Sequence, residues 1–86
     1  MLPLTQNAKD KICIYGIEEK EVEAGLDEII FDCEDVVEKS GIKIIEIRKV
    51  LFVVVISAET KKIITIYSTD SATIENRRRA GRWICY

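Results

Sequence analysis

Seven consecutive apolar residues, Val50–Ile56, constrain the fold of this chain more than any other segment. The run is rich in β-branched side chains and has no polar face, as expected of a strand that is covered on both sides. It is far shorter than the roughly 20 residues that a membrane-spanning helix needs. We therefore predict a central strand against which helices pack, with Val53 and Val55, or the residues that alternate with them, buried deepest.

The chain has 86 residues, of which 48% are hydrophobic, and this composition excludes intrinsic disorder. Its length predicts a single domain over residues 1–86. The sequence contains no secretory signal or membrane-spanning segment, so we expect a soluble cytoplasmic protein. Isoleucine is abundant, charged residues make up 33% of the chain, and Gln6 is the only glutamine. Many Lys and Glu with few labile amides are typical of proteins from thermophiles. AT-rich coding would give the same isoleucine excess, so both explanations stay open.

Two helices are predicted before the strands. Residues 4–15 carry an apolar face, with Thr5 as the expected N-cap and Gly16 as the left-handed residue that ends the helix. A second helix follows almost at once, with acidic residues in its first turn. Its apolar stripe is formed by Val22, Leu26, Ile29 and Ile30.

After Phe31 the pattern changes to that of strands. The β-branched segments are Val36–Val37, Ile42–Ile47, Val50–Ser57 and Lys62–Ser68, with turns expected at Ser40–Gly41 and Ala58–Lys61. A capped helical stretch begins at Ser71 and runs into a group of arginines. The sequence therefore predicts an α+β fold: two N-terminal helices packed on a three- to four-stranded antiparallel sheet, with a C-terminal basic helix or arm.

Charge is distributed unevenly along the chain. Residues 1–38 contain eleven acidic side chains and three lysines, whereas residues 39–86 contain ten basic side chains and four acidic ones. The basic half ends in four clustered arginines, which are Arg77, Arg78, Arg79 and Arg82. Such a cluster is a candidate site for RNA phosphates, and the alternatives are a solvated helix or a surface for an acidic protein.

The three cysteines, Cys13, Cys33 and Cys85, are far apart in the chain. With no histidine and no closely spaced cysteine pair, the sequence predicts neither a metal site nor a cofactor. We interpret the cysteines as buried or half-buried thiols. A disulfide between two of them is the alternative, because intracellular proteins of hyperthermophiles do form disulfides.

Two segments resemble a known group of proteins. Residues 4–22 read Leu4-Thr5-Gln6-Asn7-Ala8-Lys9-Asp10-Lys11 and then Tyr15-Gly16-Ile17-Glu18-Glu19-Lys20-Glu21-Val22, and residues 62–69 read Lys62-Ile63-Ile64-Thr65-Ile66-Tyr67-Ser68-Thr69. These phrases, with the arginines after them, resemble the BrnT-type toxins and the related RelE-like domains. The resemblance covers about residues 4–82. It implies the barnase–EndoU–colicin–RelE fold and metal-independent RNA cleavage, often by the toxin of a toxin–antitoxin pair.

The sequence departs from that family at two positions. Asn7 stands in place of the family's histidine and Lys11 in place of its arginine. An asparagine cannot transfer a proton, so histidine-dependent catalysis is excluded. RelE-like enzymes can use lysine, arginine and tyrosine instead, so Lys11, Tyr67 and Thr69 are the candidate catalytic residues.

Two classes of function follow from these observations. The first is an RNA-binding, toxin-like domain, for which a ribosome-associated endoribonuclease with an antitoxin partner is one form. The second is a non-catalytic interaction module from a virus, plasmid or other mobile element, for which a homodimer is one form. Trp83 and Tyr86 fit either class, because aromatic rings stack on bases and also close the edges of cores.

Overall fold

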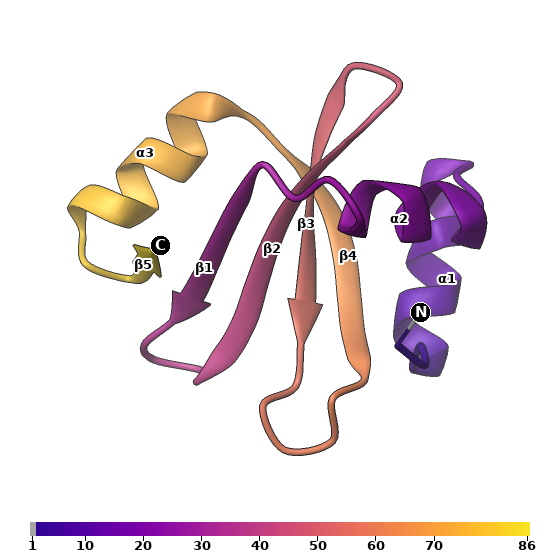
Figure 1. Ribbon diagram of the computed structural model, residues 1–86, viewed down its shortest axis with the longest axis horizontal. Coiled ribbons are helices and arrows are strands. Elements are labelled where there is room, and N and C mark those ends of the chain that lie inside the picture. The colour runs from indigo at the N-terminus through magenta and orange to yellow at the C-terminus, as the bar shows by residue number, and fades with distance from the viewer. Residues whose placement is uncertain (1) are drawn as a thin grey trace.

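The computed structural model describes residues 2–86, which form three helices and one five-stranded antiparallel sheet (Figure 1). The strand order is β4-β3-β2-β1-β5. The predicted α+β class is confirmed, with one strand more than expected. The elements are α1 (Gln6–Tyr15), α2 (Glu19–Leu26), β1 (Phe31–Asp35), β2 (Ser40–Ile47), β3 (Val50–Ile56), β4 (Ile63–Thr69), α3 (Ser71–Arg79) and β5 (Trp83–Cys85).

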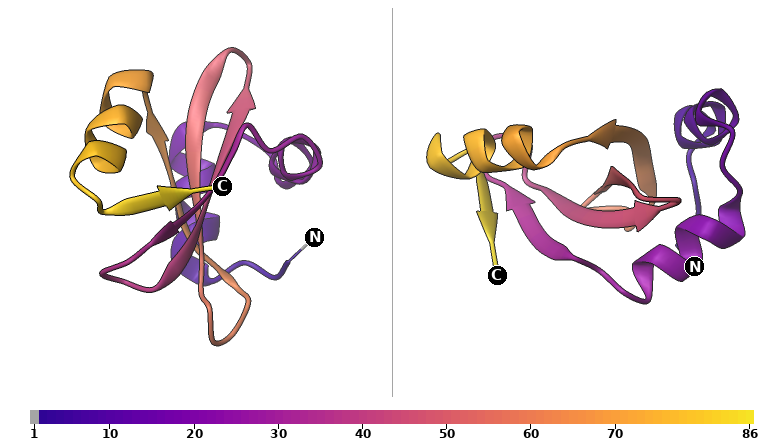
Figure 2. Two further views of the ribbon diagram at one scale, coloured as in Figure 1. Left: turned by 60° about the vertical axis from the view of Figure 1, so that its left-hand side comes forward. Right: turned by 90° about the horizontal axis from the view of Figure 1, so that it is seen from above.

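The N-terminal helices lie on one side of the sheet and α3 lies on the other (Figure 2). On the first side, Ala8 of α1 and Val22 of α2 are fully buried in one cluster with Val54 of β3. The caps of α1 are as predicted: the Thr5 side chain accepts a hydrogen bond from the Ala8 N–H, and Gly16 has a φ of 67°. The α1 helix therefore begins and ends where the local sequence sets its limits.

The second side of the sheet carries a smaller cluster around α3. Ile74 of α3 and Trp83 of β5 are buried here together with Val53 of β3. β3 is hydrogen-bonded to β2 on one side and β4 on the other, and buries side chains on both faces. The predicted central strand is therefore confirmed, and its alternate residues face the two different helix layers.

Three boundaries differ from the sequence prediction. The second helix ends at Leu26, which leaves Ile29 and Ile30 outside it and 37% and 44% exposed. The first strand is Phe31–Asp35 rather than the predicted Val36–Val37. The turn expected at Ser40–Gly41 therefore lies at residues 36–39, and Ser40 begins β2. The C-terminal residues form β5, which pairs antiparallel with β1. Each of these differences comes from pairing between distant strands, which the local periodicity of the sequence does not predict.

The cysteines are also corrected. Cys33 of β1 and Cys85 of β5 lie opposite each other in the sheet and form a disulfide. Cys13 is a free thiol on the exposed surface of α1. The interpretation of all three as buried thiols is therefore wrong, and the disulfide that we considered as the alternative is present.

Gly25 allows α2 to approach the sheet closely. A Cβ atom at this position would lie 2.8 Å from Cδ1 and 3.0 Å from Cβ of Ile45, a buried residue of β2. In an exposed helix, alanine is about 1 kcal/mol more stable than glycine. We expect Gly25→Ala to lower the free energy of unfolding instead, by about 1–3 kcal/mol, because α2 must move away from Ile45.

Chemical denaturation of the variants measures this effect. Ala24, which is exposed in the same helix, provides the matched control, since Ala24→Gly reports propensity alone. We expect both variants to be less stable than the parent chain. Stabilisation by Gly25→Ala would contradict the close approach of α2 to Ile45.

Candidate functional site

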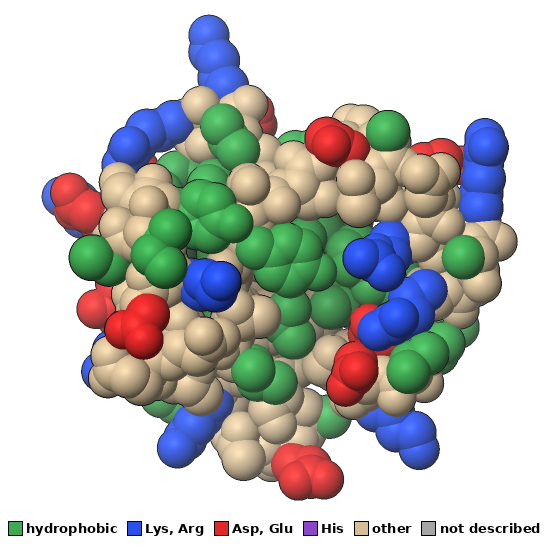
Figure 3. All heavy atoms as spheres, turned by 180° about the vertical axis from the view of Figure 1, so that it is seen from behind, with side chains coloured by type: hydrophobic (Ala, Val, Ile, Leu, Met, Phe, Trp, Pro, Cys, Tyr) green, Lys and Arg blue, Asp and Glu red, His purple; other side chains and the backbone are tan. Residues whose placement is uncertain are grey.

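The arginines of the C-terminal helix are positioned by a cap at one end and a buried anchor in the middle. The Asp70 side chain caps α3 by accepting a hydrogen bond from the Thr73 N–H at 2.7 Å, and Ile74 is 3% exposed. The last turn of α3 holds Arg77, Arg78 and Arg79, where the helix dipole favours positive charge. Seen from behind, the molecule has apolar side chains gathered in the middle, with Lys and Arg side chains on either side of them, the side of α3 included (Figure 3).

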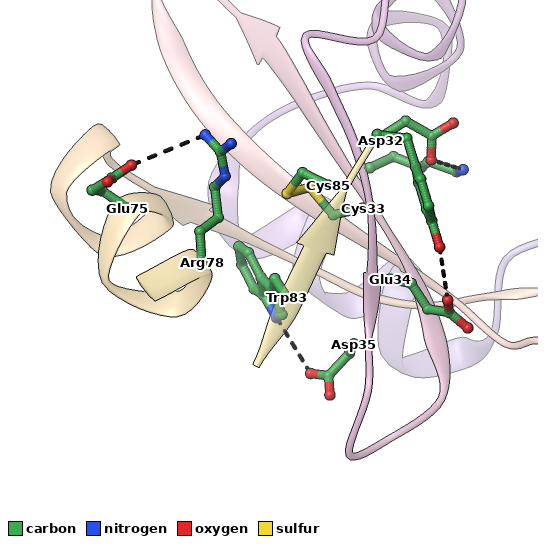
Figure 4. Close-up of a disulfide and its surroundings, with 10 residues drawn as sticks. Asp32, Cys33, Glu34, Asp35, Glu75, Arg78, Trp83 and Cys85 are labelled. Atoms are coloured by element: carbon green, nitrogen blue, oxygen red, sulfur yellow. Dashed lines mark hydrogen bonds and ion pairs between the residues drawn. A yellow bond between two sulfur atoms is a disulfide. The ribbon is translucent and has the colours of Figure 1, made fainter. Parts of the chain in front are cut away.

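Two of the arginines lie over aromatic rings. The guanidinium carbon of Arg77 is 5.7 Å from the centre of the Trp83 ring, and that of Arg78 is 5.8 Å from the centre of the Phe31 ring. Arg78 also approaches Glu75 at 4.0 Å (Figure 4). Cation–π contacts of this kind contribute about 0.5–1 kcal/mol at exposed sites. They restrict the guanidinium groups to the surface between α3 and the sheet.

The other two arginines are already paired with carboxylates. Arg79 lies 3.0 Å from Glu75, and its side chain is 77% exposed. Arg82 lies 2.9 Å from Asp35, which is 5% exposed, and 3.9 Å from Glu38. The four predicted phosphate-binding arginines therefore fall into two groups. Arg77 and Arg78 contact aromatic rings, whereas Arg79 and Arg82 form ion pairs with Glu75 and Asp35.

Asp35 is the buried polar centre of this region. Besides Arg82, its carboxylate accepts hydrogen bonds from the backbone N–H groups of Val37 and Glu38 and from the indole N–H of Trp83 at 3.3 Å (Figure 4). Burial opposes ionisation of the Asp35 carboxyl, but the hydrogen bonds from Arg82 and the backbone outweigh burial and lower its pKa. Asp35 therefore fixes Trp83 and, through that ring, the position of Arg77.

Tyr67 and Thr69 of β4 lie on the same side of the sheet as α3. Tyr67 packs against the cluster that contains Ile74. Burial raises its pKa, and the positive charges of Arg77 and Arg82 reduce that rise without cancelling it. The Tyr67 hydroxyl is therefore harder to deprotonate than that of a free tyrosine, which makes it less available as a general base at neutral pH. The Thr69 hydroxyl is buried and has no hydrogen-bond partner within residues 2–86.

Lys11 does not join these residues. It lies on α1, which packs on the opposite side of the sheet from Tyr67. Asn7 donates a hydrogen bond from its amide to the Ile64 carbonyl at 3.2 Å. This contact attaches α1 to β4. The three predicted catalytic residues are thus split between the two sides of the sheet.

A cleft adjoins the arginines at the C-terminal end of α3. It has a volume of about 560 Å³ and lies between α3 and the turn that joins β1 to β2. Its walls are formed by Val36, Val37, Thr73, Asn76, Arg77, Ala80, Gly81 and Arg82. Among residues 2–86, no group of three or more acidic or cysteine side chains is arranged to hold a metal ion. No helix in this part of the chain is long and apolar enough to cross a membrane.

No protein-family model matches the chain, and neither a curated protein nor a solved structure matches it. The resemblance to BrnT-type and RelE-like domains therefore stays a prediction.

Sequence reasoning missed two residues that organise this site, Phe31 and Asp35. Both belong to β1, and their partners Arg78, Arg82 and Trp83 lie almost fifty positions later in the chain. The only signal in the sequence was the pair of clusters itself: acidic residues at 32–38 and arginines at 77–82. Opposite charges in two segments favour pairing, but they do not identify which residues meet.

Proposed function

We propose that this domain binds single-stranded RNA without cleaving it, through the surface formed by α3 and the adjoining aromatic side chains of the sheet. The observation that carries the proposal is the placement of Arg77 and Arg78 over the rings of Trp83 and Phe31. Proteins recognise single-stranded RNA by combining arginines with aromatic rings, because guanidinium groups contact phosphates and also stack on bases.

The electrostatics of this surface support an anionic ligand. Arg77 has no ion pair with a carboxylate within the described residues, and Arg78 has only the long contact to Glu75. Each guanidinium presents a planar set of donors that fits two phosphate oxygens. The half-buried Tyr67 ring lies on the same side of the sheet and offers a further apolar surface to a base.

The positions of the candidate catalytic groups favour binding over cleavage. Metal-independent RNA cleavage needs a base and an acid on opposite sides of one phosphate. Lys11 is in the other helix layer, and burial raises the pKa of Tyr67. The chain has no histidine, and within residues 2–86 Lys11 and Tyr67 do not come together as a proton-transfer pair beside Arg77 and Arg78. The resemblance to RelE-like domains thus supports RNA as the ligand. The arrangement of the site supports RNA binding without RNA cleavage.

Replacing both arginines with glutamine tests this proposal. We expect the Arg77→Gln/Arg78→Gln variant to bind a fluorescein-labelled oligouridylate roughly 100-fold more weakly, at about 1.4 kcal/mol for each lost contact. The slope of log affinity against log salt should fall by about 1.4, because each phosphate contact on a single strand contributes about 0.7. Fluorescence anisotropy at several salt concentrations measures both quantities.

Arg79→Gln is the matched control, since it removes the same charge from the same helix. Its side chain is paired with Glu75 and 77% exposed, and the cation–π contacts of the described residues involve Arg77 and Arg78 instead. We expect it to weaken RNA binding less than threefold. The double variant removes two charges and the control removes one. If the loss of RNA affinity per charge removed were the same in both, binding would depend on net charge rather than on this surface. We expect no cleavage: oligouridylate incubated with the parent protein for a prolonged time should stay intact.

A further inference from the structure

The turn between β1 and β2 presents two apolar side chains to solvent. In residues 36–39, Val36 and Val37 are 40% and 64% exposed. Tight turns usually contain Gly, Pro, Asn, Asp or Ser, because these residues adopt turn conformations readily. Two exposed valines at such a place add nothing to the core and are unfavourable in water.

The backbone of this turn is held rigidly. The Asp35 carboxylate accepts hydrogen bonds from the N–H groups of Val37 and Glu38 at 2.9 and 3.0 Å. The Val36 N–H donates to the Arg82 carbonyl at 3.0 Å. The valines are therefore fixed in place before any ligand arrives, which reduces the entropy lost on binding.

These valines form one wall of the cleft of about 560 Å³ beside α3. The opposite wall contains Arg77 together with the polar side chains of Thr73 and Asn76. A volume of this size is within the range of about 300–1,000 Å³ that is typical of ligand sites. The cleft thus combines a fixed apolar wall with a polar wall.

The charge of the cleft identifies the kind of ligand. Arg82 is neutralised by Asp35, whereas Arg77 forms no ion pair within residues 2–86. The cleft therefore has one uncompensated positive charge beside apolar side chains. A guanidinium binds a carboxylate through two parallel hydrogen bonds, and a neighbouring apolar wall favours an aliphatic chain attached to that carboxylate.

We propose that this cleft binds the C-terminal residue of a protein partner, with its free carboxylate on Arg77 and its aliphatic side chain against Val36 and Val37. This ligand differs from RNA, and the two sites share only Arg77. Recognition of the peptide depends on Val37, whereas recognition of RNA depends on Arg78. The two proposals can therefore fail independently of each other.

A titration of the ¹⁵N-labelled protein with N-acetyl-leucyl-leucine tests this site. The C-terminal amide of the same dipeptide is the control ligand, because it has the same side chains but no charge. We expect the acid to shift the amide resonances of Val37, Asn76 and Arg77 and to bind about tenfold more tightly than the amide, which corresponds to one charged hydrogen-bond pair. Equal affinities for the acid and the amide, or shifts confined to other parts of the chain, would overturn the proposal.

Two variants separate this site from the RNA surface. Val37→Asp suits a turn and places a negative charge in the cleft, so we expect it to abolish binding of the acid. Arg78→Gln is the matched control and should bind the acid as the parent does. Arg77→Gln should remove the preference for the acid over the amide without requiring any change in the turn. Retention of that preference in Arg77→Gln would show that the carboxylate binds elsewhere.

Discussion

Reduction of the Cys33–Cys85 disulfide is expected to lower the free energy of unfolding by about 4 kcal/mol. The two cysteines are 52 positions apart, and a cross-link that closes a loop of this length restricts the unfolded chain by about that amount. For a domain of this size the loss corresponds to a decrease in Tm of roughly 20 °C. Thermal unfolding with and without a dithiol reductant measures it, and the only tryptophan, Trp83 beside Cys85, reports on β5 by fluorescence.

The remaining cysteine supplies the matched control. Cys13 is exposed and free, so Cys13→Ser should leave both Tm and its sensitivity to reductant unchanged. Cys85→Ser should reproduce the reduced protein and should not respond to reductant. Three reactive thiols per chain in the unreduced protein, together with an unchanged Tm on reduction, would rule out the disulfide as a source of stability.

Local sequence patterns predicted most of the secondary structure because their signals lie within a few residues. Thr5 and Gly16 limit α1, and the β-branched run in β3 identifies a strand that is buried on both faces. The β2–β3 connection was harder, because Arg48 and Lys49 both have positive φ angles, which usually indicate glycine or asparagine. Arg48 is held in this turn by hydrogen bonds to Glu21 and to the Gly16 carbonyl. Contacts with α2 thus stabilise a turn that its own residues do not favour.

The candidate site was only partly predictable for a related reason. The arginine cluster was evident, but each member acquires its role from a residue far away in the chain: Trp83 and Phe31 orient Arg77 and Arg78, and Asp35 neutralises Arg82. β5 has three residues, too short for a periodic signal, and its strand conformation depends on pairing with β1. Identical side chains in one sequence cluster therefore differ in role because their tertiary surroundings differ.

Asp35→Ala is expected to lower the free energy of unfolding by about 3 kcal/mol, because it leaves the Trp83 indole N–H and the Arg82 guanidinium without their buried acceptor. The turn also loses the acceptor of its two N–H groups. Asp35→Asn keeps a carbonyl oxygen but removes the charge, so it should cost about half as much. Asp32→Ala is the matched control on the same strand: its ion pair with Lys43 is at the surface, and its loss should cost less than about 1 kcal/mol. Chemical denaturation of the three variants gives these values.

The pH dependence of the free energy of unfolding separates the contribution of the Asp35 charge from that of its hydrogen-bonding shape, which Asp35→Asn retains. Because hydrogen bonds lower the pKa of Asp35 in the folded protein, its contribution is fully present above the unfolded pKa of about 3.9. The contribution is lost as the pH falls through the lower, folded pKa, since protonation then removes the charge that Arg82 contacts. The parent protein should therefore lose stability below about pH 4 more steeply than Asp35→Asn, which has no proton to bind at this position. Parallel curves for the parent and Asp35→Asn over that range would mean that Arg82 does not hold the carboxylate in its charged form.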